Sequence, residues 1–83
     1  MYYVYVICSQ EDELYIGYST DLKARLGAHN AGLNRSTKNR TWRLVYYEAY
    51  SCETDARARE KTLKVSGQAR RWLKERIRNS IKG

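Results

Sequence analysis

The chain opens with two short runs, residues 2–7 and 14–18, in which aromatic and β-branched residues dominate. Such runs, bounded by turn residues, predict β-strands. The polar linker between them is short, so the two strands are expected to form an antiparallel hairpin. Tyr5 and Tyr15 occupy positions that can meet on one face of this hairpin. Gly17 removes a side chain from the same face, which often marks the close approach of a ligand or of another chain segment.

Helical periodicity follows the hairpin. Residues 19–21, Ser-Thr-Asp, are typical of a helix N-terminus, with an acidic side chain placed to interact with the helix dipole. Leu22, Leu26 and His29 then recur at helical spacing, and Gly32 is expected to end the helix. Since these three side chains share one stripe, the histidine is expected on the buried side of the helix.

The remaining elements complete a small fold. Residues 42–50 alternate like a strand, and helices are predicted over about 53–65 and 68–81. With a hairpin followed by one crossing helix, the third strand returns antiparallel to the first, and pairing the two puts residues 2–8 in the centre. We therefore expect one domain over residues 1–83 of the α/β class (α+β type), in which helices pack around a three-stranded antiparallel sheet in the order β-β-α-β-α-α.

Glu60 is the unusual residue of the second predicted helix. The inward stripe of that helix is Ala56, Glu60 and Leu63, so a carboxylate lies among apolar positions. Buried glutamate is rare unless it is paired or binds a metal ion. Two interpretations follow: Glu60 is a metal ligand, or it forms a structural ion pair with Arg25 of the first helix.

The excess of basic residues indicates which class of partner to expect. The 83 residues include 16 Lys and Arg against 9 Asp and Glu, which gives a net charge of +7 and a pI near 9.7. So large a positive charge on a small domain favours polyanions as partners. The alternative for each basic position is an ordinary solvated surface charge. The candidates for phosphate contact are Arg35, Lys38 and Arg40 in the polar loop, and Arg70 and Arg71 on the last helix.

The cysteines and the hydropathy of the chain indicate the cell compartment in which the protein is expected. Cys8 and Cys52 have no metal-binding spacing, so we expect reduced thiols in a cytoplasmic protein. No apolar run approaches the length of a transmembrane helix, and no secretory signal pattern opens the chain. A membrane is therefore not among the expected partners.

Taken in order, the motifs resemble those of the GIY-YIG nucleases. The first family motif corresponds to residues 3–5, Tyr-Val-Tyr, and the second to residues 15–17, Tyr-Ile-Gly. The glycine that usually opens the first motif is a tyrosine here, as in small stand-alone members of the family. The likeness extends over roughly residues 2–65 and continues with residues 21–26, His29 and Asn30, residues 42–48, Ala56, Glu60 and Lys61, and Leu63 and Lys64.

The resemblance implies a metal-dependent endonuclease that hydrolyses DNA phosphodiester bonds, in DNA repair or recombination. It implies a single divalent ion, Mg²⁺ or Mn²⁺, at Glu60, and a catalytic site containing Tyr5, Tyr15, Arg25 and His29. Arginine suits the phosphate, and histidine can orient or deprotonate a neighbouring group near neutral pH. An unperturbed phenol is a poor base at that pH. The sequence does not choose between the two tyrosines as the base.

The sequence also allows a second function. A chain that keeps the fold could serve as a non-catalytic nucleic-acid-binding module or as a partner subunit. The presence of every expected site residue favours the nuclease, whereas the lack of an attached binding domain favours the module. The DNA structure that is preferred and the oligomeric state, including a homodimer or a complex with another protein, do not follow from the sequence.

Overall fold

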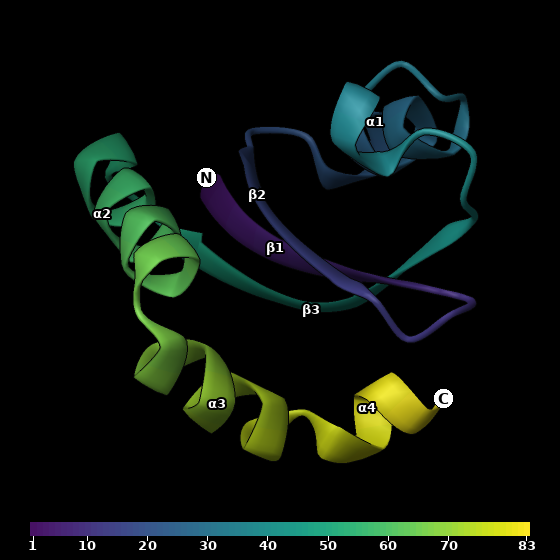
Figure 1. Cartoon of the computed structure of the whole chain (residues 1–83). Helices are drawn as coiled ribbons and strands as arrows, with labels where there is room; N and C mark the ends of the chain where they lie inside the picture. Colours follow the sequence, from purple (N-terminus) through teal and green to yellow (C-terminus); the bar gives the residue numbers. More distant parts are fainter.

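The computed structural model describes all 83 residues. Figure 1 shows the sheet between α1 on one side and α3 and α4 on the other. The order predicted from the sequence is confirmed, with one additional 3₁₀ turn in the polar loop and a division of the last helix. The elements are β1 (Tyr2–Ser9), β2 (Leu14–Ser19), α1 (Leu22–Asn30), the 3₁₀ turn η1 (Arg35–Thr37), β3 (Trp42–Tyr50), α2 (Glu53–Val65), α3 (Gly67–Arg76) and α4 (Arg78–Lys82).

The sheet has the order β2-β1-β3, and both pairs of neighbouring strands are antiparallel. The central position predicted for the first strand is therefore confirmed. A β-bulge on the β1–β3 side falls between Val6 and Ile7, which pair with Tyr46 and Leu44. The register places Tyr5 opposite Gly17 of β2.

Alternate residues of β1 enter two separate cores, which explains why this strand is apolar at almost every position. On one face, Val4 and Val6 pack against buried residues of α2 and α3. On the other face, Tyr5 and Ile7 pack with Trp42 beneath α1. The helix residues of these two cores are Ala56 and Leu63 of α2, Leu73 of α3 and Ile77 for the first, and Leu22 and Leu26 of α1 for the second.

The cap predicted for α1 is present, because the Asp21 carboxylate accepts a hydrogen bond from the backbone N–H of Ala24 at 3.0 Å. The single helix predicted over residues 68–81 is wrong in one respect, since the helix breaks at Ile77. Ile77 is buried, and the break allows both it and Ile81 to reach the core below the sheet. Helical spacing alone cannot distinguish this bend from a straight helix.

A partly buried polar cluster joins β3 to α2. The Glu48 carboxylate accepts two hydrogen bonds from the Arg59 guanidinium, at 2.9 and 3.1 Å, and one each from the hydroxyls of Tyr46 and Tyr50. Burial alone would raise the pKa of Glu48, but these four bonds outweigh it and hold that pKa below its ordinary value. The pairing attaches one flank of α2 to β3 and leaves the opposite flank facing β2.

Both cysteine thiols are free, and Cys8 is buried whereas Cys52 is exposed. None of the helices combines the length and the apolar character needed to cross a membrane.

Candidate functional site

Gly17 determines how Tyr5 is placed. A Cβ atom added to Gly17 would collide with Cζ and Oη of Tyr5. The phenol of this central-strand residue therefore lies across the backbone of β2, an edge strand, and its ring is 3% exposed. The close approach that the glycine predicts is thus made by a side chain of the protein itself.

The Gly17→Ala variant should be destabilised by about 1–3 kcal/mol, because the new methyl group overpacks a filled site and displaces the Tyr5 ring. Denaturant unfolding measures this difference. Gly27→Ala in α1 is the matched control, since a Cβ at Gly27 meets no atom within 4 Å and alanine favours a helix over glycine. Equal stability of the two variants would show that Tyr5 does not depend on the missing side chain.

His29 connects Tyr5 to the polar loop. Its imidazole is 1% exposed; Nε2 lies 2.7 Å from the Tyr5 hydroxyl, and Nδ1 lies 2.7 Å from Oγ1 of Thr37 in η1. Burial, and then the positive charge of Arg25, lower the pKa of His29, so the ring is neutral near pH 7. The predicted burial of this histidine on the helix stripe is confirmed.

The ionisation of Tyr5 is governed by the same surroundings. Burial raises the pKa of its phenol, the neighbouring Tyr15 and Glu60 raise it further, and Arg25 lowers it. Tyr5 is therefore protonated at rest, and it has a neutral imidazole nitrogen at hydrogen-bonding distance. Removing a proton from this phenol requires an acceptor at that position.

Tyr15 lies beside the same histidine. Its ring centroid is 5.0 Å from that of His29, in an edge-on arrangement, whereas the corresponding distance for Tyr5 is 5.8 Å. The Tyr15 hydroxyl accepts only a long hydrogen bond, 3.5 Å, from the amide nitrogen of Asn34. The two tyrosines therefore differ: both contact the histidine ring, but only the Tyr5 hydroxyl is bonded to it.

Glu60 lies on α2, and its charge contributes to the raised pKa of Tyr5. Its side chain is 17% exposed, and Oε2 is 3.0 Å from Nζ of Lys64. Nζ of Lys64 in turn lies 5.8 Å from the centroid of the Tyr15 ring. The structural ion pair between Glu60 and Arg25 that the sequence left open is not formed, and Glu60 pairs with Lys64 instead. Lys64 was missed as a site residue, although its spacing of four from Glu60 is the signal for a helical ion pair.

Arg25 is the free cation of the site. It is exposed, and no salt bridge of the structure involves it. Its charge nevertheless lowers the pKa values of both His29 and Tyr5. A planar guanidinium that has no protein partner and acts electrostatically on these two residues is suited to an anion such as a phosphate.

The donor set fits a divalent ion held mainly by water. The structure contains no group of three or more His, Cys, Asp or Glu side chains that could enclose a metal. The Glu60 carboxylate has one oxygen paired with Lys64, and the other oxygen has no protein partner. One carboxylate with several waters is a coordination that Mg²⁺ commonly adopts.

The basic residues proposed from the sequence divide into two groups. Arg35, Lys38 and Arg71 are exposed and form no ion pair. Arg40 and Arg70 already have partners within the protein. Arg40 is paired with Glu11, at 3.3 Å, and with Glu13, and the Arg70 guanidinium donates to the carbonyl oxygens of Leu63 and Lys64 at 2.9 and 2.6 Å.

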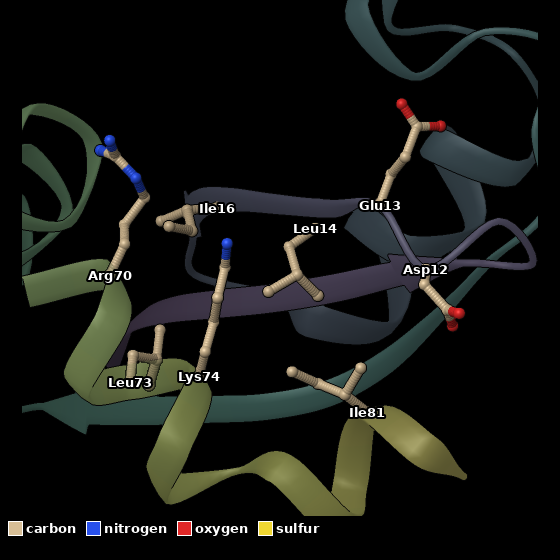
Figure 2. A pocket seen from close by; sticks show the side chains of 8 residues that line it. All are labelled: Asp12, Glu13, Leu14, Ile16, Arg70, Leu73, Lys74 and Ile81. Atoms are coloured by element: carbon tan, nitrogen blue, oxygen red, sulfur yellow. The ribbon is translucent and has the colours of Figure 1, made fainter. Parts of the chain in front are cut away.

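A hollow of about 510 Å³ lies elsewhere, on the face of the sheet opposite Tyr5. Figure 2 shows side chains of α3 and α4 facing β2 across it. Of the candidate residues only Arg70 lines this hollow, and Tyr5, His29 and Glu60 do not. The lining residues are Asp12, Glu13, Leu14, Ile16, Arg70, Leu73, Lys74 and Ile81.

Comparison with known proteins identifies the family of this chain. A family model described as the GIY-YIG catalytic domain matches residues 1–76. A UPF0213 protein of Staphylococcus haemolyticus is 39% identical over 66 residues, which cover 77% of this chain and 80% of the relative. A UPF0213 protein of Haloquadratum walsbyi is 37% identical over 65 residues, covering 76% and 73%. No solved structure matches the chain. With the family model spanning most of its length, the chain belongs to the GIY-YIG catalytic domain family.

Proposed function

We propose that this protein is a metal-dependent endonuclease that hydrolyses DNA phosphodiester bonds. The observation that carries the proposal is the Tyr5–His29 pair, 2.7 Å apart at the edge of the sheet, with Arg25 unpaired beside it. Such a group offers a proton acceptor, a hydroxyl that can exchange protons with water, and a cation for the phosphate. Membership of the GIY-YIG family supports the same reaction class.

In this mechanism Tyr5 is the base that acts on the attacking water. His29 accepts the phenolic proton through Nε2, and the Tyr5 oxygen takes a proton from the water as the water attacks phosphorus. Burial keeps His29 neutral and therefore able to accept that proton. Tyr15 is the weaker candidate for the base, because its hydroxyl has no comparable acceptor.

Arg25 and Glu60 have different roles toward the phosphate. The free guanidinium of Arg25 binds the non-bridging oxygens and stabilises the negative charge that develops on them. Glu60 would hold the divalent ion, Mg²⁺ or Mn²⁺, whose charge stabilises the departing oxygen when it is bound. The Glu60 oxygen that is not paired with Lys64 is available for this role.

The substrate is proposed to be DNA, bound mainly through its phosphates, in the cytoplasm and in repair or recombination. Arg35, Lys38 and Arg71 are the contacts that the structure leaves available, whereas Arg40 and Arg70 are engaged within the protein. The net charge of +7 supports this mode of binding. A non-catalytic DNA-binding module is the alternative function.

Labelled single-stranded, duplex, nicked and branched DNA, each incubated with Mg²⁺ or Mn²⁺, should reveal cleavage that EDTA abolishes. Binding to duplex DNA should weaken with salt at a log–log slope of about −4 to −5, if four to six phosphates are contacted. Arg71→Ala should reduce that slope by about 1. Binding without cleavage on every substrate would establish the non-catalytic module instead, and a flat salt response would exclude nucleic acid as the partner.

A further inference from the structure

We propose that Thr37 is a positioning residue of this site. Its hydroxyl holds His29 in the tautomer that carries its proton on Nδ1, which leaves Nε2 free to accept the Tyr5 proton. The inference rests on the proposed function, in which His29 takes that proton. It assigns a role to a residue outside the family motifs identified in the sequence.

Thr37 is buried in a segment that is otherwise exposed. Its relative exposure is 0%, whereas its neighbours Ser36 and Lys38 face the solvent. The Trp42 indole donates a hydrogen bond to the Thr37 carbonyl oxygen at 2.9 Å, and the Thr37 backbone N–H donates to the Asn34 carbonyl oxygen at 3.2 Å. Backbone bonds on both sides of the residue therefore fix the direction of its side chain, independently of the histidine.

The proposed direction of the hydrogen bonds depends on where the Thr37 hydroxyl sends its single proton. The Thr37 hydroxyl has one proton, and its oxygen lies 3.4 Å from the carbonyl oxygen of Asn34, which can only accept. If the hydroxyl donates there, its lone pairs face Nδ1 of His29 at 2.7 Å. Nδ1 must then carry the proton of the neutral ring.

The position of the ring proton also decides the state of Nε2, the other ring nitrogen of His29. A neutral imidazole with its proton on Nδ1 has an unprotonated Nε2, which lies 2.7 Å from the Tyr5 hydroxyl. Tyr5 therefore donates to His29. In the opposite tautomer Nε2 would itself donate to the Tyr5 oxygen and could not take its proton. Thr37 thus determines whether the phenolic proton of Tyr5 can pass to Nε2 of His29.

Nitrogen-15 NMR tests this directly, because His29 is the only histidine of the chain. In the wild-type protein above neutral pH we expect a protonated, pyrrole-type Nδ1 and an unprotonated, pyridine-type Nε2. Thr37→Val keeps the shape but removes the hydroxyl, and should shift the ring toward the Nε2–H form. DNA cleavage should fall by about 10- to 100-fold, the usual range when a group that orients a site histidine is lost.

Two further variants separate positioning from structural support. Thr37→Ser retains the hydroxyl and should restore both the wild-type nitrogen shifts and cleavage. Thr41→Val makes the same chemical change at an exposed threonine of the same loop and should alter neither. A wild-type protein with its proton on Nε2, or a folded Thr37→Val protein with unchanged shifts, would overturn the proposal. If no DNA is cleaved at all, the proposed function fails, whereas the shifts still decide the tautomer.

Discussion

Glu60→Ala is expected to abolish DNA cleavage while leaving the protein folded. Loss of the carboxylate removes the ligand for the divalent ion, whose charge contributes several kcal/mol to such reactions, so the rate should fall by roughly 1,000-fold or more. DNA binding should be unchanged or tighter, because a negative charge near the phosphate is removed. Cleavage assays and salt titrations of binding measure the two effects separately.

The structure indicates that Glu60→Ala costs little stability, which the sequence alone could not decide. A buried partnership with Arg25 would have made Glu60→Ala destabilising by about 3–5 kcal/mol. Glu60 instead pairs with Lys64, whose side chain is 47% exposed, and a helical pair of this kind contributes only about 0.3–0.5 kcal/mol. The loss of cleavage can therefore be attributed to chemistry rather than to unfolding.

Glu53→Ala provides the matched control for that experiment. Glu53 lies on the same helix and pairs with Arg57 at the same spacing, at 3.4 Å, and both side chains are largely exposed. Thermal unfolding of the two variants should be similar, and only Glu60→Ala should lose cleavage. A folded Glu60→Ala protein that cuts DNA at the wild-type rate would end the catalytic interpretation of this residue.

The fold followed from local patterns to a large extent. The apolar run of β1 and the polar linker before β2 predicted the hairpin, and strand directions then required β1 in the centre. The break at Ile77 could not be predicted, because a bent helix that keeps both isoleucines on the core has the same spacing as a straight one. Local rules also could not indicate that the Arg43 guanidinium would donate to carbonyl oxygens of α4 at Ser80 and Ile81.

For the site, residue types were predictable but their partners were not. Helical spacing placed His29 on the buried side of α1 and Glu60 on the inward stripe of α2, where the structure leaves 17% of the Glu60 side chain exposed. Thr37 lies in a polar loop, and only the tertiary structure shows that it is enclosed beneath His29. The sequence likewise did not predict that the Arg70 guanidinium donates to carbonyl oxygens at the end of α2. The partners of these side chains are set by contacts between segments distant in sequence, which local sequence patterns do not predict.

Tyr5→Phe should distinguish the two tyrosines that the sequence left equivalent. The hydroxyl of Tyr5 is bonded to His29 at 2.7 Å, whereas that of Tyr15 has only a long bond to Asn34. Removing a general base typically lowers the rate by about 100- to 10,000-fold. We expect a loss of that size for Tyr5→Phe and a much smaller one for Tyr15→Phe, measured by single-turnover cleavage.

The cost of Tyr5→Phe to the fold should be small enough to keep the comparison valid. The ring stays in place across Gly17, and the loss of one hydrogen bond, which leaves Nε2 of the buried His29 without a partner, should cost about 1–3 kcal/mol. The wild-type rate should rise with pH as long as ionisation of the Tyr5–His29 pair limits the reaction, and this dependence should disappear in Tyr5→Phe. If Tyr15→Phe is instead the inactive variant and Tyr5→Phe cuts normally, then the base is Tyr15, and the bond between Tyr5 and His29 serves only to hold α1 against the sheet.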